Sequence, residues 1–219
     1  PHALGAYLIW GFLPLYLLLV RSVPPFEFVG WRIIWTLPFC LLIVGWRGQF
    51  AALRKALGEP RTMLALLASA ALIGFNWLVY VWAILKGEVY ATSLGYYFNP
   101  LLNVLLGTLL LGERLTRRQW LAVGVAALAV ASLAAATLTS LAISLSLALS
   151  FALYGFVRQQ VDVGSVPGLT IESAILFVPA LAVVGWYAAG PQGTVFGADA
   201  ELTLAIVGAG VVTAVPLLL

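Results

Sequence analysis

The sequence predicts an all-α integral membrane protein that crosses the bilayer several times. Of its 219 residues, 63% are hydrophobic and only 9% are charged, whereas soluble domains carry about 25% charged residues. The apolar residues form continuous runs of about 20 positions, the length that an α-helix needs to cross the hydrocarbon core. Apolar and polar residues do not alternate in segments of about ten, the pattern that would predict a transmembrane β-barrel.

Four apolar segments in the first half of the chain predict four long helices, over residues 4–20, 27–46, 62–85 and 89–111. A turn containing Ser22, Pro24 and Pro25 ends the first, because these residue types favour turns over helices. A loop rich in Arg and Lys follows the second helix. The turn 86–88 follows the third, and Gly112 ends the fourth.

The second half of the chain predicts four more helices, over residues 118–136, 141–161 and 168–189, and from about 202 onward. A very short polar break, Thr137 to Ser140, separates the first two of these. A loop with the sequence GPQGTVFGADAE precedes the last helix, which is still apolar at Leu219. About eight membrane helices are therefore expected in this chain.

Basic residues gather in alternate turns, and this predicts the orientation of the chain. If the N-terminus is cytoplasmic, the turns on that side hold most of the basic residues: Arg47, Arg54, Lys55, Arg61, Arg114, Arg117, Arg118 and Arg158. The opposite side keeps only Arg21 and Lys86, while Arg32 lies inside a helix. Because cytoplasmic loops carry the excess of Lys and Arg, we expect a cytoplasmic N-terminus.

The chain also carries a weak internal repeat with offsets of 141 to 144 residues. The ordered similarities are Trp10-Gly11-Phe12 with Tyr154-Gly155-Phe156, Ser22-Val23-Pro24 with Ser165-Val166-Pro167, and Pro38 with Pro179. Five helices separate the copies, so the second copy enters the membrane from the opposite side, as in many secondary transporters. We expect one repeat of five helices over 1–137 and a truncated repeat of three over 138–219, with two further helices after Leu219.

Polar residues inside the predicted helices indicate a central cavity, because polar side chains in membrane helices face the bundle interior. The clearest polar face belongs to segment 89–111, where Thr92, Tyr96, Asn99, Asn103 and Gly107 are spaced by 4, 3, 4 and 4 residues. The alternative is that Asn and Ser only join helices and Gly only permits close packing. The candidate substrate-binding residues are Tyr7, Trp10, Arg32, Asn76, Tyr80, Tyr96, Asn99, Asn103 and Tyr154.

Two charged residues lie within predicted helices, near opposite ends of the membrane, so a direct salt bridge between them is not expected. Arg32 either attracts an anionic group of a substrate or bonds to carbonyl groups of neighbouring helices. Glu172 either carries a proton, as a candidate for proton coupling, or extends to the inner interface. The single cysteine, Cys40, and the single histidine, His2, predict no metal cluster, so no catalytic residue, metal or cofactor is expected.

Three segments carry a resemblance to a known family: IGFNWLVYVWAI (73–84), ATSLGYYFNPLLNVLLGTLLLGERL (91–115) and RRQWLAVGVAALAV (117–130). Together they resemble the RarD branch of the EamA transporters, in the drug/metabolite transporter (DMT) superfamily. The resemblance implies ten helices arranged as two inverted five-helix repeats around a central cavity. It also implies a permease or exporter of small metabolites or drugs.

The expected function is secondary transport of a small organic molecule by alternating access, in the inner membrane of a bacterium. The expected partners are a small-molecule substrate and the lipid bilayer, without nucleic acid, and a homodimer is left open. One alternative is a membrane enzyme acting on lipid-linked substrates, which would need clustered acids or histidines. Another is an ion channel, which would need rings of charge or a carbonyl filter.

Overall fold

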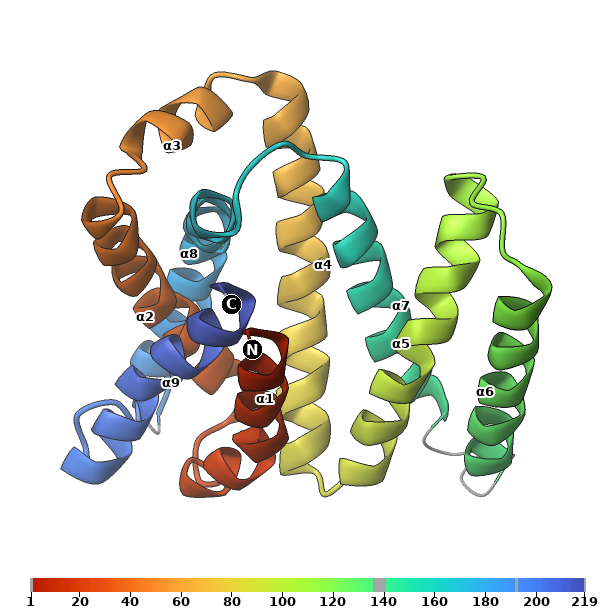
Figure 1. Cartoon of the computed structure of the whole chain (residues 1–219). Coiled ribbons are helices and arrows are strands. Elements are labelled where there is room, and N and C mark those ends of the chain that lie inside the picture. Colours follow the sequence, from red (N-terminus) through yellow and green to blue (C-terminus); the bar gives the residue numbers. More distant parts are fainter. Residues whose placement is uncertain (1, 136–140, 192, 219) are drawn as a thin grey trace.

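The computed structural model describes residues 2–135, 141–191 and 193–218, and in these residues all regular secondary structure is α-helical (Figure 1). This confirms the predicted all-α fold. The boundary expected between residues 137 and 138 lies outside the described residues. The helices are α1 (His2–Leu19), α2 (Pro25–Trp46), α3 (Phe50–Leu57), α4 (Pro60–Leu85), α5 (Val89–Leu110), α6 (Arg117–Ala135), α7 (Leu141–Gln159), α8 (Ser165–Ala189) and α9 (Ala200–Leu218).

Eight of these helices match the predicted segments to within a few residues. The prediction began α8 at residue 168, whereas the helix starts at Ser165. Pro167, the third residue of α8, is compatible with the helix. Proline has no backbone N–H group, and the first four N–H groups of a helix have no partner within the helix in any case. The prediction missed α3, which occupies eight residues of the loop that was expected to be irregular.

Five helices of the described chain, α2, α4, α7, α8 and α9, are long and apolar enough to cross a membrane. Helix α1 adds a shorter apolar stretch, Leu8–Leu19. Large apolar side chains cover the outside of the bundle, where Leu42 and Leu128 are 72% and 74% exposed. Such a surface is solvated by lipid rather than by water, so the chain is a multi-pass membrane protein.

Helix α2 makes extensive contacts with both α8 and α9. Helix α4 packs against α7 and α8, and α1 packs against α9. Helix α5 packs mainly against α7, and α6 packs against α5. Figure 1 accordingly shows α5 and α6 together at one side of the bundle.

Two glycines bring α2 into close contact with its neighbours. A Cβ atom on Gly210 of α9 would lie 2.6 Å from the carbonyl carbon of Trp35 and 2.8 Å from the backbone nitrogen of Thr36. A Cβ atom on Gly30 of α2 would lie 2.8 Å from Cγ2 of Val184. Small residues at such crossings let helix backbones touch, which is how helices associate in lipid.

The short helix α3 crosses the end of the bundle between α2 and α4 (Figure 1). Its Ala56 is buried and packs in a cluster with Leu66 of α4 and Ile171 of α8. Its Arg54 and Lys55 are exposed. A helix with one apolar and one basic face is suited to the membrane interface, and α3 therefore closes this end of the bundle.

The loop between α8 and α9 folds back onto the start of α2, at the other end of the bundle. Glu27, in the first turn of α2, is only 1% exposed. Its Oε1 accepts hydrogen bonds from Thr194 Oγ1 at 2.6 Å and from the backbone nitrogen of Val195 at 3.0 Å. The ring of Phe196 stacks on Trp31 at 4.2 Å between centroids, so this loop is packed against the helices.

We predict that Gly210→Ala destabilises the protein by about 1–3 kcal/mol, because the added methyl group would overlap the backbone of α2. The matched control is Gly185→Ala in α8, where an added Cβ meets nothing within 4 Å. Thermal unfolding in detergent, followed by tryptophan fluorescence, measures both variants. Equal midpoints for the two variants would show that α2 and α9 are not held in backbone contact.

Candidate functional site

A small cavity lies among six helices, α1, α2, α4, α5, α7 and α9. Its volume is about 20 Å³, which is room for about one water molecule. One cation, one amide, one hydroxyl, two leucines and five aromatic side chains surround it. These residues are Arg32, Asn76, Thr213, Leu13, Leu217, Trp10, Trp77, Tyr80, Tyr96 and Phe151.

Arg32 is the charged residue of the cavity and is only 5% exposed. Its Nε donates a hydrogen bond to Thr213 Oγ1 of α9. Its Cζ lies 4.7 Å from the ring centroid of Trp77, a cation–π distance. Its Nη1 is buried and has no hydrogen-bond partner, so this nitrogen is an unused donor beside the cavity.

Aromatic rings form a continuous wall that joins four helices around the cavity. Phe151 of α7 lies at its centre, with ring centroids 6.0 Å from Trp10 and 6.1 Å from Tyr96. Tyr96 in turn meets Tyr80 at 5.9 Å. These pairs are edge-to-face, a geometry that adds stability beyond burial of area. The wall therefore presents both faces and edges of aromatic rings to the cavity, together with the hydroxyl groups of Tyr80 and Tyr96.

Asn76 lines the cavity and also joins α4 to α7. Its Nδ2 donates to the backbone oxygen of Leu147 and to Oγ of Ser150, both at 2.9 Å. Both amide protons are thereby used, and the side-chain carbonyl oxygen is the group left to accept a hydrogen bond. Asn76 therefore combines the helix-joining role with a position at the cavity, so the two interpretations from the sequence do not exclude each other.

Glu172 belongs to a separate buried cluster that links α4, α7 and α8. It is 1% exposed, and its Oε1 lies 3.5 Å from Nε of Arg158. Ser69 Oγ donates to the same oxygen at 2.5 Å, and Tyr154 OH donates to Oε2 at 3.4 Å. Gly168 makes room for this pair, since a Cβ there would lie 2.2 Å from Nη2 of Arg158.

The structure brings five of the nine predicted binding residues to one cavity: Trp10, Arg32, Asn76, Tyr80 and Tyr96. The side chain of the predicted Tyr7 lies outside the described residues. Tyr154 instead faces Glu172. Asn99 is buried but does not line the cavity, and its Oδ1 has no hydrogen-bond partner.

Asn103 is exposed and does not line the cavity, although it shares a helix face with Tyr96. Seven residues separate the two, a rise of about 10 Å along a helix. Helix α5 packs mainly against α7 rather than α4. A shared helix face therefore did not ensure a shared cavity.

Five cavity residues were not among the predicted set: Leu13, Trp77, Phe151, Thr213 and Leu217. Trp77 and Phe151 resemble ordinary apolar positions in the sequence, and nothing in their spacing separates them from lipid-facing aromatics. Thr213 did carry a signal, because it is a hydroxyl residue inside an apolar helix. Its hydrogen-bond partner Arg32 lies 181 positions away in the sequence, so the sequence alone could not predict that the two residues pair.

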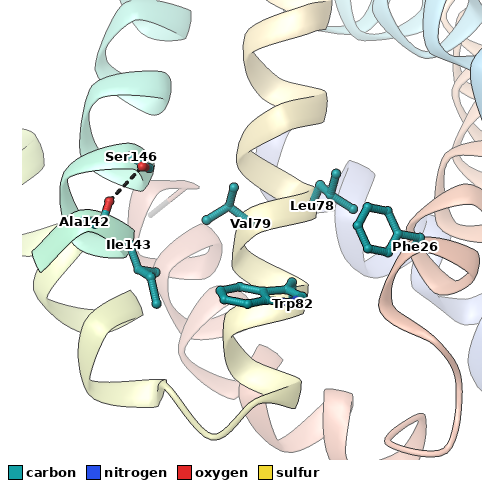
Figure 2. Close-up of a pocket in the computed structure, with 7 residues that line it drawn as sticks. All are labelled: Phe26, Leu78, Val79, Trp82, Ala142, Ile143 and Ser146. Carbon is teal, nitrogen blue, oxygen red and sulfur yellow. Dashed lines mark hydrogen bonds between the residues drawn. The ribbon is translucent and has the colours of Figure 1, made fainter. Parts of the chain in front are cut away.

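A larger groove of about 330 Å³ opens on another side of α4 (Figure 2). Its lining comes from α2, α4 and α7: Phe26, Leu78, Val79, Trp82, Ala142, Ile143 and Ser146. The one hydroxyl, Ser146 Oγ, already donates to the backbone oxygen of Ala142 at 2.7 Å. Among the described lining residues, the indole of Trp82 is the other side chain with a polar group. The groove contains no charged group or amide, so the central cavity is the better candidate for binding a polar solute.

Comparisons with known proteins agree with this architecture. The profile of the EamA-like transporter family matches residues 2–135. An uncharacterized transporter of Pseudomonas aeruginosa is 42% identical over 218 residues, covering 98% of this chain and 72% of that protein. Protein RarD of Escherichia coli is 39% identical over 217 residues, covering 99% and 73%.

A further relative, named chloramphenicol-sensitive protein RarD, of Pseudomonas aeruginosa, is 31% identical over 188 residues, covering 84% of this chain and 63% of that protein. No solved structure matches the chain. The family profile spans more than half of the chain, and the two closer relatives described above cover nearly all of it. The chain therefore belongs to the EamA-like transporter family, as a membrane transporter of the RarD type.

Proposed function

We propose that this chain is a secondary transporter that moves a small organic solute through the central cavity by alternating access. The observation that carries the proposal is the cavity itself, a polar space enclosed by α1, α2, α4, α5, α7 and α9. Four of these helices come from residues 1–137 and two from residues 138–219. A binding site between two parts of a helical bundle is the usual plan of such transporters.

The packing of the helices supports the proposal that 1–137 and 138–219 are inverted repeats. If α7, α8 and α9 correspond to α1, α2 and α4, the contact of α4 with α7 corresponds to that of α9 with α1. The contact of α2 with α9 corresponds in the same way to that of α8 with α4. Because α2 and α8 correspond to each other, the contact between them is its own counterpart. This is the pattern that a two-fold relation between the repeats produces.

The size of the cavity supports alternating access rather than a fixed binding pocket. A volume of about 20 Å³ is far below the roughly 300–1,000 Å³ of typical small-molecule sites. The surrounding helices must therefore separate before a solute enters. The packed loop at Glu27 and the helix α3 close the two ends of the bundle, so opening on either side requires a change in these contacts.

We further propose a location in the inner membrane of a bacterium, with the N-terminus in the cytoplasm. Four of the basic residues that support this orientation, Arg47, Arg54, Lys55 and Arg61, lie between α2 and the first turn of α4 and are exposed. Arg158 contributes less than expected, because it is half buried against Glu172. The partners required are a small-molecule solute and the lipid bilayer.

We predict that Tyr96→Leu lowers solute flux by about tenfold, because it removes an aromatic ring and a hydroxyl from the cavity, a loss of about 1.4 kcal/mol. The matched control is Tyr97→Leu, which alters a neighbouring ring that is 62% exposed and should leave flux unchanged. Proteoliposomes loaded with radiolabelled chloramphenicol or benzoate provide the measurement.

Saturable flux that falls only in Tyr96→Leu is the expected result. Equal flux in the two variants would place the solute path elsewhere. Flux that rises without saturation would favour the channel alternative. Flux of neither probe, together with turnover of a lipid-linked substrate, would favour the membrane enzyme.

We predict that a cysteine replacing Lys86 reacts with a membrane-impermeant maleimide in intact bacterial cells, because the turn between α4 and α5 faces outward in the proposed orientation. A cysteine replacing Lys55 in α3 should react only after the membrane is disrupted. Cys40 gives little background, since it is fully buried. The opposite labelling pattern would reverse the orientation.

We predict that Glu172→Gln abolishes the dependence of flux on a pH gradient while solute binding persists, because a carboxamide cannot take up a proton. The control is Glu27→Gln, an equally buried acid that contacts the α8–α9 loop rather than a basic residue. Flux with an imposed pH gradient, and without one, tests both variants. A gradient dependence that survives in Glu172→Gln would remove this residue from proton coupling.

A further inference from the structure

Arg32 carries a buried positive charge that nothing in the described part of the chain neutralises. No carboxylate oxygen in that part lies within 4.0 Å of its nitrogens. The ionisable side chains that act on it electrostatically are Tyr16, Tyr80 and Tyr96, and tyrosine is uncharged near neutral pH. A buried charge without a counter-ion is strongly disfavoured, so the site is suited to receive an anion.

The other arginine in the interior of the bundle provides an internal comparison. Arg158 also leaves one buried nitrogen, Nη1, without a hydrogen bond. Its charge, however, is offset by Glu172 at 3.5 Å. Arg158 thus joins α7 to α8 with a carboxylate of the chain beside it. Arg32 differs because it lines a cavity and has no such partner.

The surroundings of Arg32 hold its guanidinium group in a fixed orientation. Thr213 Oγ1 accepts from Nε, and Trp77 covers one face of the group. The remaining donors lie in one plane, and this planar arrangement matches the two oxygens of a carboxylate or phosphate. With Nη1 free, an incoming oxygen would meet a donor that has already lost its water.

The rest of the cavity selects among organic anions. Arg32 is the only cation in the lining, and one cation balances a monoanion better than the charge of about −1.5 to −2 on a phosphate monoester. The walls are the rings of Trp10, Trp77, Tyr80, Tyr96 and Phe151. Aromatic rings set at steep angles to one another can receive a further ring by stacking or by edge-to-face contact.

We propose that the solute of this transporter is an organic monocarboxylate with an aromatic body. Its carboxylate binds Arg32, and its ring lies against the aromatic wall. This inference rests on the proposed function, since it names the substrate class of the same cavity. It adds a testable requirement for negative charge that the transporter proposal alone does not contain.

The test is calorimetric titration of the purified full-length chain with two acids, benzoate and indole-3-acetate, and with their uncharged amides, benzamide and indole-3-acetamide. We expect the acids to bind about 10- to 100-fold more tightly than the amides, the contribution of a charge-assisted hydrogen bond. Arg32→Gln should remove this preference, so that acids and amides bind equally. Arg21→Gln, at an exposed arginine, is the matched control and should keep it.

Two further variants cover the case in which Arg32→Gln does not fold. Arg32→Lys keeps the charge without the planar donors and should bind acids more weakly than the wild type but still better than amides. Thr213→Val releases the guanidinium group while keeping its charge, and should weaken acid binding with little effect on the amides.

Equal binding of acids and amides, or an acid preference that persists in Arg32→Gln, would overturn the inference. Tighter binding of phenyl phosphate than of benzoate would overturn the monocarboxylate class, and so would the absence of acid binding up to the solubility limit. Saturable chloramphenicol flux that depends on Tyr96 would still support the transporter in each of these cases. Equal flux in Tyr96→Leu and Tyr97→Leu would instead contradict the proposed path through the cavity.

Discussion

The geometry of the site depends on one contact between backbones, where Gly210 of α9 lies against α2. At this separation the hydroxyl of Thr213, almost one turn further along α9, reaches Nε of Arg32. A Cβ atom at position 210 would lie 2.6 Å from the carbonyl carbon of Trp35, so a larger residue there would push α9 away from α2. The close packing of Gly210 against α2 therefore determines the position of the charged guanidinium group of Arg32.

The two ends of the bundle are closed by different physical means. At one end α3 packs an alanine into the bundle and leaves its basic residues exposed, so it depends on the apolar contact at Ala56. At the other end the loop after α8 donates hydrogen bonds to Glu27 and stacks Phe196 on Trp31. The cluster around Glu172 links α4, α7 and α8. It also touches the cavity wall, since the ring of Tyr154 lies 6.0 Å from that of Phe151.

Much of the fold was predictable because bilayer thickness sets the length of each apolar run, and eight helices follow from run length alone. Helix α3 was missed because eight amphipathic residues are too short for that criterion. Helical spacing predicted that Tyr96, Asn99 and Asn103 share a face, but only Tyr96 lines the cavity. Residue spacing shows which side chains share one face of a helix. It does not show how far along that face a neighbouring helix remains in contact. For the same reason, the pairing of Thr213 with Arg32 could be recognised only in the folded structure.

The single-water volume of the cavity has a thermodynamic consequence. The conformation described here has no room for the solute, so binding draws only on the fraction of molecules in which the helices have separated. The apparent dissociation constant is then the intrinsic constant divided by that fraction. Tight packing around Phe151 and Gly210 thus lowers the measured affinity by keeping the open population small. Helix packing and solute affinity are coupled quantities in this protein, and a weak apparent affinity is compatible with a well-formed site.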